Sequence, residues 1–317
     1  MLRVTLFGKF HARAETQDIT PTLGAKMQEL LAYLLINRSR LHTREALADA
    51  LWPEAAPDRS QKYLRQTLWQ LQSALDKEVE AGHELIVGLE PGWIHLNPET
   101  AVWSDIEVFE QAFMLVRSVP GHDLTVQQAQ VVSEAVELYQ GDLLADWYSD
   151  WCVYERERLQ SVYFTLLDKL MDHCLTQHQY EDGLAYGMVI LRYEPTREPT
   201  HQRLMRLYYL NGNRPAALRQ YERCRAVLDK EFQVKPVRTT NELYEQIRAD
   251  RLEDLPTMAS PVSSATAGVI VPETLARLQQ ILTTLETLHS AVQFQIDAWS
   301  GQPNTVAGGG CGMLQPN

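Results

Sequence analysis

The clearest pattern of hydrophobic and polar positions lies between Asp58 and Leu75. Read at about 100° per residue, its leucines fall in one narrow stripe made of Leu64, Leu68, Leu71 and Leu75. The opposite face holds cations, amides and an aromatic ring: Arg59, Lys62, Gln66, Trp69, Gln70 and Ser73, with Tyr63, Arg65 and Thr67 on its flanks. We predict a helix whose leucines enter a core. Its outer face is either a solvated surface or a nucleic-acid contact, since Arg and Lys suit phosphates and Gln or Arg suits base edges.

The segments around this helix predict a winged helix-turn-helix. Alternation over residues 2–11 predicts one strand, with a second near Ile19, and apolar spacing predicts a helix over Ala25–Asn37. Thr43 is a good N-cap for a short second helix. Two apolar runs about a Pro-Gly turn predict a β-hairpin over Leu85–Leu96. In a winged helix-turn-helix the third helix enters the major groove and the hairpin lies beside the DNA backbone.

Helical periodicity dominates from about Val102 onward. Amphipathic or long helices are predicted over residues 105–117, 126–139 and 151–176. Residues 170–192 then align with residues 204–226 at an offset of 34. This offset is the period of tetratricopeptide repeats, whose stacked helix pairs form surfaces for protein contacts and small effectors.

We therefore predict a mainly α chain. It would hold a winged helix-turn-helix with small β-elements, a tetratricopeptide-like helical domain and a C-terminal heptad helix. The expected divisions are residues 1–100, residues 101–250, a flexible linker at 251–272, a heptad helix at 273–299 and a disordered tail at 300–317. The heptad seam, which contains His289, favours a dimeric coiled coil, and the alternative is one amphipathic helix packed on the body.

Composition narrows the class of protein. With 317 residues, 45% of them hydrophobic, the chain has length for about two domains with real cores. No apolar run reaches about 18 residues, the start lacks the apolar core of a signal peptide, and four widely spaced cysteines form no CxxC pair. We expect a cytoplasmic protein without a membrane segment. The net charge of −12 argues against a nonspecific nucleic-acid coat, although residues 26–70 carry a small cationic excess.

No residues point to an enzyme, a metal or a cofactor. The patterns GxxxxGK[ST], GxGxxG and GxSxG are missing from the sequence. His173, Cys174 and His178 come nearest to a metal cluster, but structural zinc needs about four closely spaced ligands. Three acids of an irregular stretch are better interpreted as solvated side chains: Asp142, Asp146 and Asp150.

A run of arginines between His201 and Ala226 leaves two interpretations open. Its cations are Arg203, Arg206, Arg214, Arg219, Arg223 and Arg225, and its one acid is Glu222. The first interpretation is the exposed outer faces of two helices. The second is a site for an anion or an acidic partner, such as a phosphate-bearing effector held by guanidinium groups, with Arg203, Arg206, Arg219 and Arg223 as candidates.

Several stretches together resemble a known family. They are LLAYLLIN, TREALADALWPEAAPDRSQKYLRQTLWQLQSAL, EPGWIHL, GDLLADWYSDWCVYERERL and AALRQYERCRAVLDKEFQVKP. They resemble the Streptomyces antibiotic regulatory protein type of activator, over about residues 1–250. Such proteins pair an OmpR-like winged helix with a bacterial transcriptional activator domain, usually bind direct repeats as side-by-side dimers, and recruit RNA polymerase.

The resemblance implies roles for particular residues. Asp58–Leu75 would be the recognition helix, and Leu85–Leu96, with Gly92 and Trp93, would be the wing. The loop at Trp52, Pro53 and Glu54 would touch RNA polymerase. The expected DNA contacts are Arg59, Lys62, Tyr63, Arg65, Gln66, Trp69 and Gln70, with Arg38, Arg40 and Arg44 near phosphates.

The sequence departs from the family pattern where relatives tend to be basic. Gln70, Gln72 and Ser73 replace cations late in the recognition helix, and the wing tip carries Glu90. Each phosphate contact that is lost lowers affinity and its dependence on salt. Two hypotheses follow: a dimeric transcriptional regulator that binds double-stranded promoter DNA, with the helical domain as a dimerisation or effector module, or a signalling adaptor whose winged helix, repeats and heptad helix bind proteins.

Overall fold

A small four-stranded sheet lies at the N-terminus of the computed structural model, which describes residues 1–78, 85–89, 92–97, 100 and 102–252. Its strands are β1 (Leu2–Thr5), β2 (His11–Ala14), β3 (Gln17–Asp18) and β7 (Val102–Ser104), in the order β3-β2-β1-β7. Strand β7 runs parallel to β1, and the other pairs are antiparallel. The alternation of buried and exposed residues in β1 and β2 gives the sheet one core face and one solvent face.

The prediction of one strand over residues 2–11 is wrong. Strand β1 ends at Thr5 because the next two backbone N–H groups, of Leu6 and Phe7, donate to the Asp105 carboxylate instead of to a neighbouring strand. Gly8 then takes a φ of +85°, a conformation that suits glycine. The chain reverses and starts β2 at His11, which pairs with Thr5.

The winged helix-turn-helix has its elements where the sequence predicts them. Its helices are α1 (Ala25–Ile36), α2 (Arg44–Leu51) and α3 (Pro57–Glu78), and a short η1 turn (Thr20–Thr22) precedes them. A second sheet of order β4-β6-β5 is built from β4 (His42–Thr43), β5 (Ile86–Leu89) and β6 (Trp93–Leu96). Thr43 caps α2, since its side chain accepts a hydrogen bond from the Ala46 N–H.

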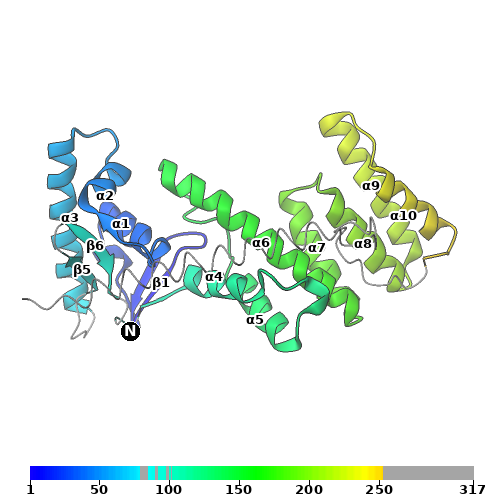
Figure 1. Cartoon of the computed structure of the whole chain (residues 1–317), viewed down its shortest axis with the longest axis horizontal. Coiled ribbons are helices and arrows are strands. Elements are labelled where there is room, and N and C mark those ends of the chain that lie inside the picture. Colours follow the sequence, from blue (N-terminus) through cyan, green and yellow to red (C-terminus); the bar gives the residue numbers. More distant parts are fainter. Residues whose placement is uncertain (79–84, 90–91, 98–99, 101, 253–317) are drawn as a thin grey trace, which may run out of the picture. The chain divides into compact units, whose positions relative to one another are not determined.

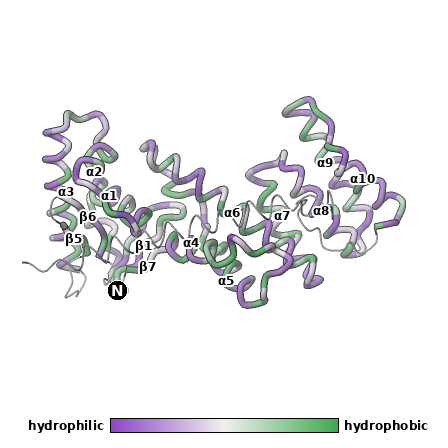
Figure 2. Tube along the Cα trace, viewed as in Figure 1, coloured by the Kyte–Doolittle hydropathy of each residue, from purple (hydrophilic) through white to green (hydrophobic). Residues whose placement is uncertain are grey.

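The rest of the described chain is helical. Its elements are α4 (Asp105–Val116), η2 (Gly121–Asp123), α5 (Val126–Glu137), α6 (Asp150–Thr176), α7 (Tyr180–Tyr193), α8 (Glu198–Leu210), α9 (Arg214–Phe232) and α10 (Arg238–Arg248). Helices α6 to α9 pack on one another in chain order (Figure 1). Hydrophobic and hydrophilic residues alternate along α9 and α10, as one buried face per helix requires (Figure 2).

The 34-residue offset of the repeat places a small residue at equivalent packing positions of α7 and α9. Gly183 of α7 lies so close to α8 that an added Cβ would be 2.9 Å from Leu207 Cδ2. Thirty-four residues later, Ala217 of α9 is fully buried. Each second helix of a pair therefore places a small residue where it meets its neighbours.

The winged helix and the helical region share one hydrophobic core within the compact unit 1–254. Two buried acids also join them. Asp105, at the start of α4, accepts hydrogen bonds from the end of β1, and Glu29 of α1 accepts from Ser149 Oγ at 2.7 Å and Trp151 Nε1 at 3.3 Å. The boundary at residue 100 stays a prediction. The linker beyond Leu252, the heptad helix and the tail lie outside the described residues.

Candidate nucleic-acid interface

Helix α3 divides into a buried and an exposed side as its spacing predicts. Ser60, Leu64, Thr67, Leu71 and Leu75 are buried, and Leu68 is half-buried. The predicted contact residues are exposed on the other side: Arg59, Lys62, Tyr63, Arg65, Gln66, Trp69 and Gln70. Trp69 is 69% exposed, which leaves its ring available to a partner.

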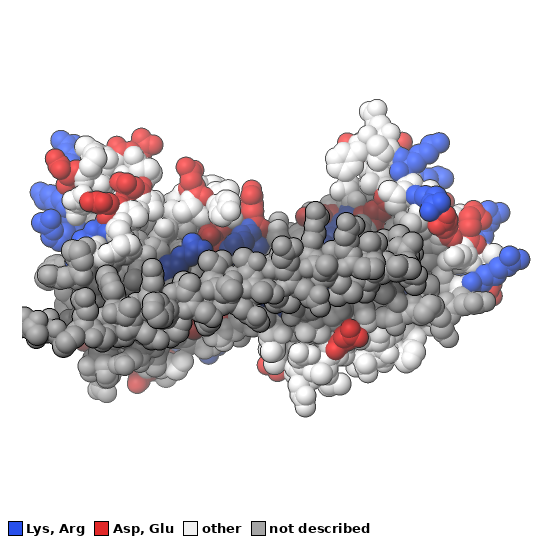
Figure 3. Space-filling model, viewed as in Figure 1, with Lys and Arg blue, Asp and Glu red and all other residues white. Residues whose placement is uncertain are grey.

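The cations around this surface have no partner within the described chain. Arg59, Lys62 and Arg65 on α3 make no side-chain hydrogen bond or ion pair with any described residue, and neither do Arg40 and Arg44 before and on α2. Figure 3 shows blue cationic atoms along the outer side of α3. Cations left free in this way can form ion pairs with an external polyanion without first breaking internal ones.

The wing is attached directly to the start of α2. Strand β6 pairs with β4, and the Arg44 N–H donates to the Gly92 carbonyl at 3.1 Å. The Arg44 Nη2 lies 3.6 Å from the position that a Cβ would occupy on Gly88 of β5. Gly92 turns with a φ of +85°, and Trp93 beside it is 38% exposed. Residues 90–91 of the wing tip lie outside the described residues.

Arg38 differs from the other expected phosphate contacts because it has partners within the chain. Its Nη1 donates to Glu107 Oε2 at 2.5 Å and to the Val102 carbonyl at 3.2 Å. Its guanidinium therefore ties the end of α1 to β7 and the first turn of α4. These contacts hold the two regions together, and a phosphate contact of Arg38 stays a prediction.

The loop between α2 and α3 has a packed base and an exposed tip. Trp52 is half-buried, with Lys26 Nζ 5.3 Å from its ring centroid and the Tyr63 ring 6.2 Å away. The same Lys26 Nζ donates to the Leu51 carbonyl, at the end of α2, at 2.6 Å. Pro53 and Glu54 are exposed. Lys26 was not predicted from sequence as part of this site, because it lies 25 residues before its acceptor.

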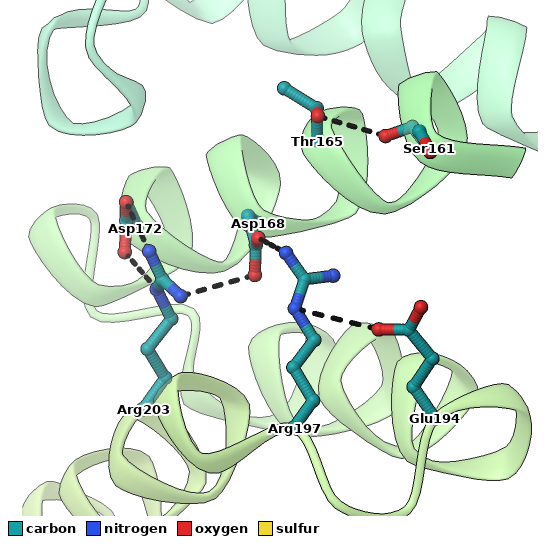
Figure 4. A network of polar contacts seen from close by, with 7 residues as sticks. All are labelled: Ser161, Thr165, Asp168, Asp172, Glu194, Arg197 and Arg203. Atoms are coloured by element: carbon teal, nitrogen blue, oxygen red, sulfur yellow. Dashed lines mark hydrogen bonds and ion pairs between the residues drawn. The ribbon is translucent and has the colours of Figure 1, made fainter. Parts of the chain in front are cut away.

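The four arginines predicted to form one anion patch have different surroundings. Arg203 of α8 is held by Asp168 and Asp172 of α6, as Figure 4 shows. Arg219 and Arg223 are exposed on α9. Arg206 is half-buried on α8 and makes no ion pair with any described residue. The periodicity of α8 and α9 could not reveal this, because the carboxylates that bind Arg203 lie on another helix.

The other chemical candidates have structural roles. His173 and Cys174 are buried, and burial raises the pKa of the Cys174 thiol to about 11. His178 is exposed and contacts Tyr180 Oη at 2.6 Å. In the described part of the chain, no three His, Cys, Asp or Glu residues are grouped so that they could hold a metal ion. None of the described helices is long and apolar enough to span a membrane.

Residues 104–248 match the family described as the bacterial transcriptional activator domain. Regulatory protein AfsR of Streptomyces coelicolor is 27% identical over 269 residues, which is 84% of this chain but 26% of that protein. Transcriptional regulatory protein EmbR of Mycobacterium tuberculosis is 25% identical over 300 residues, covering 92% of this chain and 76% of that protein.

A solved structure shares the fold. It is Mycobacterium tuberculosis EmbR in complex with a low affinity phosphopeptide. The two structures superpose with a TM-score of 0.61 at 22% identity, over 80% of this chain and 66% of the EmbR chain. The likeness includes both the winged helix and the helical region, because it extends well beyond the 145 residues of the matched domain.

Proposed function

We propose that this chain, a regulator of the Streptomyces antibiotic regulatory protein type with a bacterial transcriptional activator domain at residues 104–248, binds double-stranded promoter DNA through helix α3. The observation that carries the proposal is the set of exposed cations on and beside α3 that have no partner among the described residues. In this fold the same helix enters the major groove.

The residues on the outer face of α3 support different roles for the two halves of the helix. Arg59, Lys62 and Arg65 lie in its first half and would bind phosphates or guanine edges. Gln66 has the amide that suits adenine. Trp69 and Gln70 follow, and would contact a thymine methyl, a sugar or a neighbouring protomer. Base reading would therefore come mainly from the first turns of the helix.

The modest number of cations supports a requirement for cooperation between protomers. We expect side-by-side dimers on direct repeats, since a second protomer doubles the phosphate contacts that one α3 makes. The exposed Pro53 and Glu54 would contact RNA polymerase from their packed base on Trp52. The helical region would serve dimerisation or effector binding.

Selection of fragments bound from the native genome tests the proposal. The full chain should enrich fragments that share a repeated element, and Lys62→Glu/Arg65→Glu should enrich none. The matched control is Arg219→Glu/Arg223→Glu, which changes the net charge equally on α9 and should enrich the same fragments. If the unaltered chain binds no fragment at about 50 mM salt, where phosphate contacts are strong, the adaptor hypothesis replaces this one.

A further inference from the structure

A network of charged side chains joins the facing sides of α6 and α8 (Figure 4). Arg203 Nε donates to Asp172 Oδ1 at 2.8 Å, and its Nη1 donates to Asp168 Oδ1 at 3.1 Å. Arg197 Nη2 donates to the other oxygen of Asp168 at 2.6 Å, and its Nε lies 4.0 Å from Glu194. The carboxylates of Asp168 and Asp172 are thus already engaged by these two guanidinium groups.

Arg206 lies one helical turn beyond Arg203 and is left out of this network. It is half-buried, and it makes no hydrogen bond or ion pair with any described residue. Its Nε is fully buried and has no acceptor among the described residues. Burial lowers the pKa of the Arg206 guanidinium, and the charge of Arg203 lowers it further, while Asp172 opposes the shift. Native proteins rarely leave a buried donor on a charged group unpaired, because the desolvation is not repaid.

The charges of the cluster show what Arg206 lacks. Its cations are Lys169, Arg197, Arg203 and Arg206, and its carboxylates are Asp168, Asp172 and Glu194. The four cations exceed the three carboxylates by one, and neither Lys169 nor Arg206 makes an ion pair with any described residue. Lys169 Nζ donates to the Val119 carbonyl, whereas Arg206 has no acceptor among the described residues. Arg197 also has a buried Nη1 without an acceptor, but it lies roughly 13 Å away along α8 and belongs to the other end of the cluster.

We propose that Arg206, beside Arg203, binds the phosphate group of a small molecule. A guanidinium donates two parallel N–H bonds to a phosphate, and the two terminal nitrogens of Arg206, Nη1 and Nη2, make no hydrogen bond with any described residue. A phosphate group carries about −1.5 to −2 charges at neutral pH, so it would more than offset the single excess charge, and its several acceptor oxygens could accept from the terminal nitrogens of Arg206 while reaching the outer edge of Arg203. The site extends the effector role proposed for the helical region. It uses no residue of α3.

Thermal unfolding of the full chain, with inorganic phosphate or adenosine monophosphate added at constant ionic strength, tests the site. Both anions should raise the unfolding temperature above its value in acetate. Tighter binding of the nucleotide would assign the phosphate to an organic molecule, and equal or weaker binding would assign it to inorganic phosphate. No stabilisation by either anion, relative to acetate, overturns the proposal.

Two variants locate the effect. Arg206→Met keeps the apolar stem of the side chain and removes its charge, so it should bind phosphate at least tenfold more weakly, by calorimetry, and lose the thermal response. It should unfold no earlier than the unaltered chain when phosphate is omitted, because it removes an uncompensated charge. Arg223→Met, on the exposed face of α9, is the control and should respond fully.

A phosphate response that survives in Arg206→Met, or that disappears equally in Arg223→Met, overturns the assignment. If Arg206→Met does not fold, phosphate binding is measured with Arg206→Lys instead. Lysine retains the charge but not the paired donors, so binding should weaken without being lost. These measurements contain no DNA, so their failure is distinct from a failure of DNA binding by α3.

Discussion

Replacing Asp105 with alanine should destabilise the protein strongly, because this carboxylate lies where the winged helix meets the helical region. The Leu6 N–H donates to both of its oxygens, at 3.0 and 2.8 Å, and the Phe7 N–H donates to Oδ2 at 2.9 Å. The Ile106 N–H, in the first turn of α4, donates to Oδ1 at 2.9 Å. Asp105 is only 2% exposed, so water cannot replace it readily.

The expected magnitude follows from the three donors that alanine would leave unpaired. A buried N–H without an acceptor costs about 1–3 kcal/mol, so the loss in unfolding free energy should be at least about 3 kcal/mol. That is a large part of the roughly 5–15 kcal/mol that stabilises a typical domain. Asp105→Asn keeps one acceptor oxygen but turns an NH₂ group toward a donor, and should lose an intermediate amount.

Urea unfolding followed by circular dichroism measures the loss, and amide hydrogen exchange locates it. Exchange at Leu6 and Phe7 should accelerate on the order of 100-fold, the equivalent of about 3 kcal/mol. The control is Asp146→Ala, which removes an exposed 3.3 Å ion pair with Lys9 and should cost at most about 1 kcal/mol. If Asp105→Ala loses no more than this control, the carboxylate does not hold the junction together.

Three further outcomes follow from the packing. Gly121→Ala should destabilise the chain by about 1–3 kcal/mol in thermal unfolding, since its Cβ would lie 2.6 Å from the Lys169 carbonyl oxygen. Gly24→Ala, whose Cβ would meet nothing within 3.4 Å, should cost less than about 1 kcal/mol, the advantage of glycine over alanine as the N-cap of α1. Burial lowers the pKa of His201, so the folded chain resists a proton that the unfolded chain accepts. Stability should therefore fall as the pH drops below about 6.5, and less so in His201→Asn, by urea titration across that range. If the heptad segment holds a dimer, deleting residues 252–317 should turn the dimer into a monomer of the shortened chain by light scattering. A shortened chain that stays dimeric would place the dimer contact elsewhere.

The helices could be predicted closely because their signals are local. The leucine spacing of α3 fixed its buried face, and Thr43 marked the start of α2. The N-terminal sheet could not be predicted as well. Strand β7 has three residues and pairs with β1 from about one hundred residues away, as in the Leu2↔Val102 pair, so no local pattern reveals it. The early end of β1 likewise depends on Asp105, in another element.

In the candidate site, too, local features could be predicted from the sequence and long-range contacts could not. Exposure of Arg59, Lys62 and Trp69 follows from their positions on an amphipathic helix, which periodicity predicts well. Whether an arginine is free depends on distant acids. Arg38 is bound by Glu107, 69 residues later in the chain, and Arg203 by carboxylates 31 and 35 residues earlier. Only the folded arrangement could separate these structural arginines from the free cations of α3.

The salt dependence of binding to a genomic fragment tests most directly whether α3 contacts DNA. Each phosphate contact contributes a slope of about −0.9 to the logarithm of the binding constant against the logarithm of salt concentration. The unaltered chain should therefore give a steep negative slope. Lys62→Glu/Arg65→Glu should bind more weakly, with a slope shallower by about 1.8 per protomer, and Arg219→Glu/Arg223→Glu should keep the original slope. A flat salt dependence of the unaltered chain, or the same slope in the α3 variant, would contradict the account.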